Sequence, residues 1–226
     1  LSLSVQGKEV NMTSPDGKYQ FTLSDSGGQL HYSLTWNGKQ TVKPSLLGIN
    51  ANVEWRDGVE IGTVDSSRKD TIWHPDYGER SEIKDCYHAW KIVVNRQNGR
   101  DKLILDVRAY DEEIAFRYHF PGGQYLKITD EYTEYTMPEG TKAYFTPKAQ
   151  TPYSYLPLEN WPGESDRPLL LTLADGGYVC LAEAQVVDYV RTKFNVSPTK
   201  KNTVISAMYG PVEDIAPYST PWRVIM

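Results

Sequence analysis

The stretch Gly27-Gly28-Gln29-Leu30-His31-Tyr32-Ser33-Leu34-Thr35-Trp36-Asn37-Gly38 decides the fold class of this chain. Its apolar residues, at positions 30, 32, 34 and 36, alternate with polar ones, which is the period-two pattern of a strand with one buried face. A glycine pair precedes the alternation, and Asn37-Gly38 follows it with the residues that a two-residue hairpin turn favours. The stretch therefore predicts a β-strand that ends in a hairpin.

The same pattern recurs along most of the chain. Ser14-Pro15-Asp16-Gly17 predicts a turn before an alternating segment at Tyr19, Phe21 and Leu23. Further strands are expected at residues 91–95, 103–110, 114–120, 125–135, 143–146, 169–173, 178–182 and 203–209, whereas only 183–190 could be helical. So many short strands with turns between them predict an all-β fold, a sandwich of two large packed antiparallel sheets.

Two stretches do not show a strand pattern. Residues 55–87 carry turn signals and scattered acids, and residues 147–168 hold five prolines, which a central strand does not accept. Long loops in a compact domain are functional or pack on a neighbour, so we expect both stretches to be contact surfaces.

Composition excludes several classes of function. The net charge of −5 offers no basic footprint for nucleic acid, and no run approaches the roughly 18 apolar residues of a membrane span. Cys86 and Cys180 match no metal spacing. The spacing leaves open whether they pair, and two buried thiols are the favoured interpretation.

The densest functional cluster is Trp73-His74-Pro75-Asp76-Tyr77-Gly78-Glu79-Arg80. Aromatic rings stack on the apolar faces of sugars while carboxylates bind hydroxyl groups. The predicted substrate-binding residues are therefore Trp73, His74, Asp76, Tyr77 and Glu79, with Trp161 from the proline-rich stretch. A loop held by its own hydrogen bonds and packed on another domain explains the cluster equally well.

No catalytic residue is predicted. Glycoside hydrolysis needs two carboxylates across one pocket, and the acids at positions 112, 113, 131, 134 and 159 do not form a recognisable pair. Nucleophile elbows, phosphate-binding loops and zinc spacings are missing from the sequence. A mutarotase-type acid and base formed by His74 and His88 stays open as an alternative.

The order of the motifs along the chain resembles glycoside hydrolase family 97. The matching motifs are Ser14-Pro15-Asp16-Gly17, Asn37-Gly38-Lys39, Lys43-Pro44-Ser45-Leu46-Leu47-Gly48, the 73–79 cluster, Arg108-Ala109-Tyr110, Ile114-Ala115-Phe116-Arg117-Tyr118, Asp175-Gly176-Gly177-Tyr178, Glu183-Ala184, Val187-Asp188-Tyr189 and Thr220-Pro221-Trp222-Arg223. Each motif is weak, but their shared order and spacing cover nearly the whole chain.

The resemblance implies a three-part enzyme that cleaves α-glucosides or α-galactosides. Residues 1–226 would be its single N-terminal domain, a β-supersandwich of the galactose-mutarotase type, and Pro221-Trp222-Arg223 resembles the crossing into a catalytic (β/α)8 barrel expected after residue 226. The catalytic carboxylates belong to that barrel in the family. The resemblance also implies a periplasmic or secreted protein, for which the short, polar start Leu1–Val5 would be a mature N-terminus.

The resemblance further implies calcium in the parent enzyme. The family lends a Glu to the metal from the loop after the strand that matches Ala143-Tyr144-Phe145, where this chain has Ser154. Because serine is a weaker ligand than carboxylate for a hard cation, Glu159 is the nearest candidate, and no calcium is expected for this chain alone.

The resulting prediction is a non-catalytic domain that packs on its own barrel and helps to shape the site for an oligosaccharide substrate, with no nucleic-acid or membrane partner. The alternatives are a free-standing carbohydrate-binding module, which would depend on Trp73 or Trp161, and a mutarotase-like enzyme.

Overall fold

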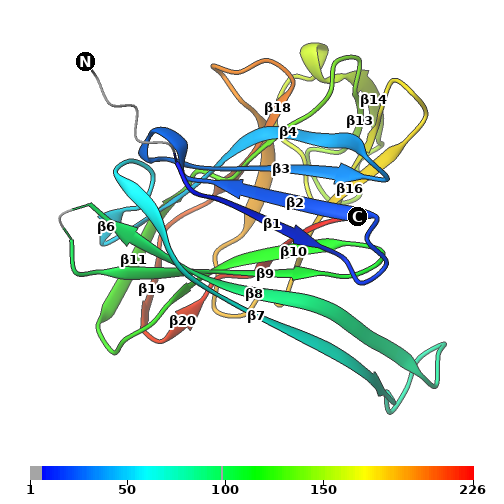
Figure 1. The fold of residues 1–226 in the computed structure, drawn as a ribbon. Coiled ribbons are helices and arrows are strands. Elements are labelled where there is room, and N and C mark those ends of the chain that lie inside the picture. The colour runs from blue at the N-terminus through cyan, green and yellow to red at the C-terminus, as the bar shows by residue number, and fades with distance from the viewer. Residues whose placement is uncertain (1–6, 98) are drawn as a thin grey trace.

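The computed structural model describes residues 7–97 and 99–226, which form an all-β sandwich of three antiparallel sheets (Figure 1). The hairpin predicted from residues 27–38 is present: Trp36 pairs with Lys39 across the turn. Asn37 and Gly38 have φ angles of 51° and 76°, the left-handed values that such a turn requires. The start Leu1–Val5 discussed above and residue 98 lie outside the described residues.

The first large sheet has seven strands, four from the N-terminal end of the chain and three from its second half. In sheet order its strands are β1 (Glu9–Thr13), β2 (Tyr19–Ser24), β3 (Leu30–Trp36), β4 (Lys39–Leu47), β12 (Glu134–Thr136), β18 (Thr203–Met208) and β17 (Thr192–Val196).

The second large sheet has ten strands. In sheet order nine of them are β14 (Ser154–Pro157), β13 (Lys142–Phe145), β15 (Leu169–Thr172), β16 (Tyr178–Ala184), β21 (Trp222–Ile225), β10 (Ile114–Phe120), β9 (Lys102–Ala109), β8 (Ile83–Arg96) and β7 (Val59–Trp73). The short β20 (Tyr218–Ser219) pairs with β10. The chain's last strand, β21, is therefore central in this sheet.

A third, four-stranded sheet closes one side of the sandwich. Its order is β19 (Val212–Ile215), β11 (Tyr125–Glu131), β5 (Ile49–Ala51) and β6 (Val53–Glu54). Two 3-10 turns, η1 (Ser26–Gly28) and η2 (Leu158–Asn160), complete the described elements, and neither is long or apolar enough to cross a membrane.

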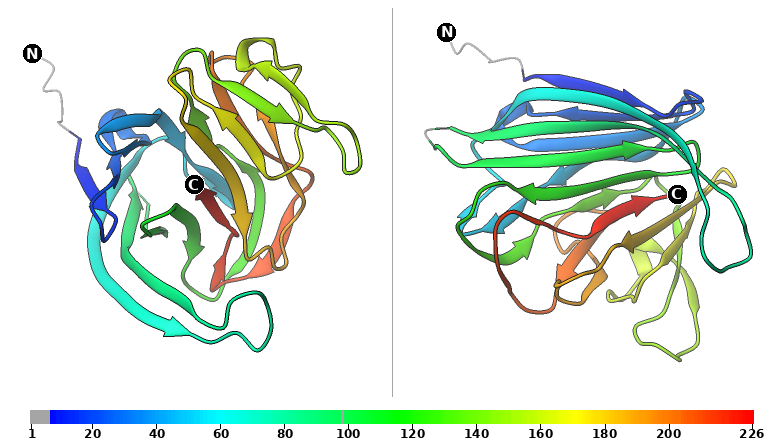
Figure 2. Two further views of the ribbon diagram at one scale, coloured as in Figure 1. Left: turned by 90° about the vertical axis from the view of Figure 1, so that its right-hand side faces the viewer. Right: turned by 90° about the horizontal axis from the view of Figure 1, so that it is seen from below.

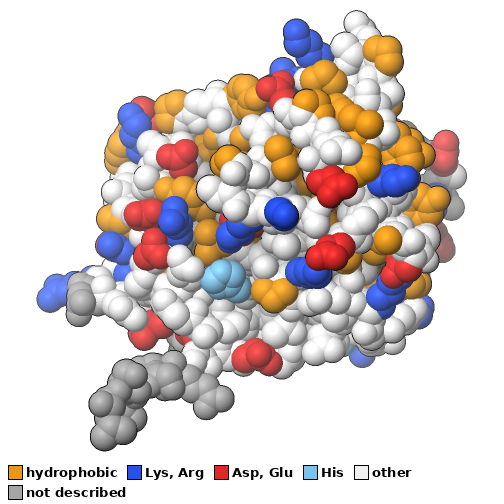
Figure 3. All heavy atoms as spheres, turned by 90° about the horizontal axis from the view of Figure 1, so that it is seen from above, with side chains coloured by type: hydrophobic (Ala, Val, Ile, Leu, Met, Phe, Trp, Pro, Cys, Tyr) orange, Lys and Arg blue, Asp and Glu red, His pale blue; other side chains and the backbone are white. Residues whose placement is uncertain are grey.

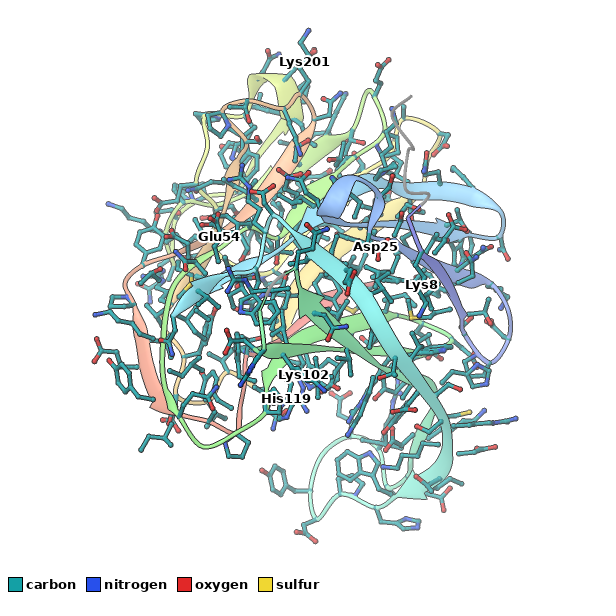
Figure 4. The ribbon with its side chains drawn as sticks, turned by 60° about the vertical axis from the view of Figure 1, so that its left-hand side comes forward. Lys8, Asp25, Glu54, Lys102, His119 and Lys201 are labelled. Atoms are coloured by element: carbon teal, nitrogen blue, oxygen red, sulfur yellow. The ribbon has the colours of Figure 1, made fainter. Side chains whose placement is uncertain are left out.

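One continuous core joins the two large sheets. Phe21 and Tyr32 from the seven-stranded sheet stack with ring centroids 5.1 Å apart, and Phe116 from the ten-stranded sheet packs on Tyr32 at 5.4 Å. Polar contacts fasten the sheet edges as well: Asp25 accepts hydrogen bonds from the backbone N–H groups of Lys8 and Ile61 (Figure 4). The outer surface seen in Figure 3 carries Lys and Arg interspersed with Asp and Glu.

Three of the secondary-structure predictions, for a loop, a strand and a helix, need correction. The stretch 55–87 is not a loop, because it contains β7 and the start of β8. The expected strand at 125–135 divides into β11 and β12, which lie in different sheets. Residues 183–190 form no helix, since β16 continues to Ala184 and irregular chain follows. Residues 147–168 are largely outside strands, and Pro157 ends the edge strand β14, as proline requires.

Candidate functional site

A two-stranded arm projects from the ten-stranded sheet. Strand β9 pairs with β8 only as far as Ala109 opposite His88, whereas β7 and β8 stay paired to Trp73 opposite Ile83. Residues 69–87 therefore leave the sheet as a free hairpin, here called the arm, which projects from the sandwich in Figure 2 (right). Side chains on both faces of most of the arm meet solvent, so its sequence shows no hydrophobic alternation.

The predicted cluster at residues 73–80 forms the tip of the arm. Trp73 is 49% exposed and Tyr77 is 90% exposed, and His74, Asp76 and Glu79 are exposed beside them. His74 Nδ1 lies 3.1 Å from the carbonyl oxygen of Ser81, so the tip is closed by a hydrogen bond of its own. The tip presents two unpartnered aromatic rings, and their contact with a substrate stays a prediction.

Trp161 does not present a ring to a ligand. Its side chain is 4% exposed and its ring packs on Phe145, with centroids 5.6 Å apart. The 3-10 turn η2 directs Leu158 and Trp161 inward, so this predicted sugar contact is a core residue. The prediction of Trp161 as a substrate-binding residue is therefore wrong in this structure.

The described residues offer few candidate ligands for calcium. Glu159 lies exposed in η2, and Ser154 lies exposed on the edge strand β14. Among the described residues, no group of three or more Asp, Glu, His or Cys side chains could hold a metal ion. Because Ca²⁺ takes six to eight oxygen ligands, the described residues do not form a calcium site by themselves. The two cysteines are free, with Cys86 buried and Cys180 partly buried.

The mutarotase pair is also incompatible with the structure. His74 lies at the tip of the arm, whereas His88 lies at its base, with Nδ1 2.9 Å from the carbonyl oxygen of Thr13. The five residues from Ile83 to His88 span roughly 16 Å of extended strand. His74 and His88 therefore cannot act on one sugar as an acid and base pair.

The structure reveals a hollow that the sequence did not indicate. This hollow, here called the arm hollow, has a volume of about 480 Å³ and lies on the ten-stranded sheet at the base of the arm, where Lys69 and Tyr87 line it; the sheet face that carries it is called the outer face. The guanidinium of Arg108 stands 4.7 Å from the ring centroid of Tyr87 and 4.6 Å from that of Trp222. Arg117 packs on Trp222 at 4.3 Å, so two guanidinium groups and two rings form one stack.

His119 of β10 lines the same hollow (Figure 4). Its Nδ1 lies 2.9 Å from Ser219 Oγ. Partial burial lowers the pKa of His119, while the neighbouring Asp106 acts in the opposite direction. Asp106 is itself held by Arg117, whose Nε donates to the carboxylate at 3.1 Å.

Beneath the outer face lies a buried ionic cluster centred on Arg223. This side chain is fully buried and pairs with Glu131 of β11 and Glu183 of β16; its Nε donates to Glu131 Oε1 at 2.8 Å. Arg167 adds a third pair, with Nε 2.7 Å from Glu183 Oε2. Burial is the largest single effect and would raise the pKa of Glu131, but the charge and hydrogen bonds of Arg223, together with Thr133 and Arg167, lower that pKa below its ordinary value.

The ionic cluster forms the floor of a second hollow of about 540 Å³, here called the loop hollow. Thr151 and Tyr153 of the proline-rich stretch line one side of it, and Tyr189 and Arg191 line the other. Asp166 accepts two hydrogen bonds from Arg191 Nη2, at 2.7 and 3.0 Å. The predicted contact stretch 147–168 thus meets the segment after β16 at this hollow.

The two hollows are neighbours on the outer face. Gln185 Oε1 accepts hydrogen bonds from Arg117 Nη1 and from Trp222 Nε1, both at 3.3 Å, and Val186 beside it lines the loop hollow. Three of the acids that line the hollows, Asp106, Asp166 and Glu183, are each held by an arginine. The surface therefore has ordered rings and paired charges, which suit contact with another surface better than acid and base chemistry.

Comparison with known proteins agrees with this architecture. A family model described as glycosyl-hydrolase 97 N-terminal matches residues 12–226. A retaining alpha-galactosidase of Bacteroides thetaiotaomicron is 27% identical over 146 residues, which are 63% of this chain and 21% of that protein.

Solved structures share the fold. A glycoside hydrolase family 97 enzyme from Pseudoalteromonas sp. strain K8, in complex with panose, superposes with a TM-score of 0.87 at 22% identity over 96% of this chain and 35% of that one. A beta-arabinopyranosidase superposes with a TM-score of 0.88 at 20% identity over 96% and 40% of the two chains. The chain thus spans about a fifth of the length of the curated relative and 35–40% of these two solved chains.

Proposed function

Because this chain belongs to the glycosyl-hydrolase 97 N-terminal family, we propose that it is the non-catalytic N-terminal domain of an α-glycosidase. In this proposal the domain packs on a catalytic (β/α)8 barrel and forms one wall of the barrel's carbohydrate site. The relatives support the additional domain, since the chain covers only 21–40% of the proteins compared above.

The stack of Tyr87, Arg108, Trp222 and Arg117 is the observation that supports packing most strongly. Tyr, Trp and Arg are the residues enriched at protein interfaces and among their energetic hot spots. A guanidinium held between two rings has already lost much of its rotational freedom, so binding a partner costs less entropy. Trp222 also forms a small apolar cluster with Ala115 and Val224 outside the main core, which a partner would extend.

The proposed carbohydrate wall consists of the arm and the proline-rich stretch. Tyr87 of the arm lines the arm hollow and Tyr153 lines the loop hollow, so both elements border the proposed packing surface. The related Pseudoalteromonas enzyme has been solved with panose and with acarbose, which supports an oligosaccharide as the substrate of the parent enzyme. Trp73 and Tyr77 at the arm tip are the proposed ring contacts, with His74, Asp76 and Glu79 as the hydrogen-bonding groups.

Two further features of the parent enzyme are proposed from the family resemblance. The enzyme would act in the periplasm or outside the cell. Any calcium ion would draw at most one ligand, Glu159, from the described residues and the others from elsewhere in the parent enzyme, because the described residues offer no group of three or more His, Cys, Asp or Glu that could hold a metal.

The proposal is tested in two ways. The purified 226-residue chain should release no nitrophenol from para-nitrophenyl α-glucoside or α-galactoside. In the protein that joins this chain to its barrel, Arg108→Ala and Trp222→Ala should each lower both kcat/KM and the thermal midpoint. Tyr125→Ala removes a 55% exposed ring from β11, away from both hollows, and is the matched control. Hydrolysis by the isolated chain, or wild-type behaviour of both outer-face variants, would overturn the proposal.

A further inference from the structure

We propose that the chain carries a second, separate carbohydrate site, a track of four exposed aromatic side chains that binds a neutral oligosaccharide. The aromatic track consists of Trp36, Tyr178, Tyr155 and Tyr144. It lines two adjoining hollows of about 550 and 300 Å³, which share Tyr178 and the glycine turn before it. The inference does not rest on the proposed packing function, because none of these four residues lines the arm hollow or the loop hollow.

The track begins at one end of the sandwich, where several hairpin turns converge. The larger hollow is bordered by the turns β1–β2, β3–β4, β9–β10 and β15–β16, and by Met226. Figure 2 (left) looks onto the end at which Met226 lies. In the register of β16 and β21, Trp222 lies opposite Ala184, six residues beyond Tyr178. Six residues of strand span about 20 Å, so Trp222 and the track occupy different ends of the sheet.

The four rings of the track are exposed, and two of them, Tyr144 and Tyr155, are held in place. Trp36 is 43% exposed, Tyr178 69%, Tyr155 42% and Tyr144 37%. Tyr144 and Tyr155 stack with centroids 4.1 Å apart, and Tyr155 Oη lies 2.8 Å from Thr172 Oγ1. Large apolar rings usually lose their exposure on folding, and rings that are already ordered lose little entropy when a ligand covers them.

The polar groups of the larger hollow indicate a ligand without charge. Lys18 and Lys39 are balanced there by Asp111 and Glu112. Lys39 also reaches across to Asp175 at 2.5 Å, which ties the β3–β4 turn to the β15–β16 turn. Gly176 and Gly177 carry no side chains, so the floor between Trp36 and Tyr178 stays open.

A pyranose oligomer matches this combination. Each ring offers an apolar face that packs on an aromatic side chain, and its edge hydroxyls both donate and accept hydrogen bonds, which suits a rim of lysines and carboxylates. The larger hollow alone falls within the usual volume of a ligand site, and the second hollow continues it past Tyr178. The length therefore favours an oligosaccharide over a single sugar.

The test is a titration of the 226-residue chain with maltotriose, followed by calorimetry and by saturation-transfer NMR. We expect millimolar binding that Trp36→Ala and Tyr178→Ala each weaken at least tenfold. Trigalacturonic acid, a charged trimer of similar size, should bind more weakly. Tyr125→Ala is the matched control, since it removes a 55% exposed ring from β11, which lines neither hollow of the track, and should leave the affinity unchanged.

Several results would contradict the proposal. Absence of a saturation-transfer signal for maltotriose, tighter binding of trigalacturonic acid, or loss of binding in Tyr125→Ala alone would overturn it. Circular dichroism and the urea midpoint show whether the variants fold. If Trp36→Ala fails to fold, Tyr155→Ala provides the same comparison, because it removes only an exposed ring from the edge strand β14. Normal affinity in that variant together with Tyr178→Ala would overturn the track.

Discussion

Arg223 is expected to hold the domain together through its buried ion pairs, and its replacement by alanine is the sharpest test of the structure. The guanidinium is fully buried and binds the fully buried carboxylate of Glu131 and the nearly buried carboxylate of Glu183. Removing it leaves Glu131 buried without a cation, while Glu183 keeps Arg167. The loss of stability therefore comes mainly from the carboxylate of Glu131. It affects the three strands that the cluster joins, β11, β16 and β21.

Breaking a buried pair by removing one partner costs about 3–5 kcal/mol, because an uncompensated charge remains in the interior. For a domain of this size each kcal/mol corresponds to roughly 2–4 °C, so Arg223→Ala should lower the thermal midpoint by about 6–20 °C. Urea unfolding followed by tryptophan fluorescence measures the free energy directly, and the slope with urea should not change.

The pH dependence separates this explanation from a simple loss of packing. In the wild type the pKa of Glu131 lies below its ordinary 4.5. Its stabilising contribution is therefore fully present above pH 4.5 and is lost as the pH falls through the folded-state pKa. In Arg223→Ala burial acts on Glu131 without the guanidinium and raises that pKa, so the variant should be weakest near neutral pH and approach the wild type in acid.

Lys127→Ala is the control, because it removes an ion pair in which both side chains are about half exposed, and it should not shift the urea midpoint measurably. A loss in Arg223→Ala below about 1 kcal/mol, or a loss that stays constant from neutral pH to acid, would refute the reasoning.

Three further predictions concern other parts of the fold. Phe116→Ala should destabilise the domain by about 3–5 kcal/mol in urea unfolding, because this fully buried ring joins both large sheets through Phe21 and Tyr32. Gly38→Ala should cost about 1 kcal/mol in the same assay, since Gly38 has φ of 76°, whereas Gly123→Ala, in open space without a left-handed backbone, should be neutral. An NMR titration should place the pKa of His119 below 6.5, and Asp106→Asn should lower it further, because the charge of Asp106 raises it.

Most strands could be predicted from the sequence because their signal is local. In β2, β3 and β10 one face is buried and the other is not, so apolar and polar residues alternate. The hairpin at Asn37-Gly38 was predicted for the same reason, since its φ angles depend on two adjacent residues.

The arm could not be predicted, although it contains the predicted cluster at residues 73–80. Its strands meet solvent on both faces, so no face needs apolar residues and the alternation disappears. Trp161 could not be placed from the sequence either. A tryptophan in a proline-rich loop can point toward solvent or into the core, and only its packing on Phe145 shows that it belongs to the core.

The sequence by itself determined which segments extend and where they turn, because strand and turn preferences depend on neighbours one to four residues away. Only the tertiary structure decided where the charges and rings meet. Arg223 contacts Glu131, which lies 92 residues away in the sequence, and Arg108 contacts Trp222, which lies more than a hundred residues away. The contact of Arg108 with Trp222 depends on the strand order β21, β10 and β9, whereas the contact of Arg223 with Glu131 joins β21 to β11 of the four-stranded sheet. No local pattern encodes either arrangement.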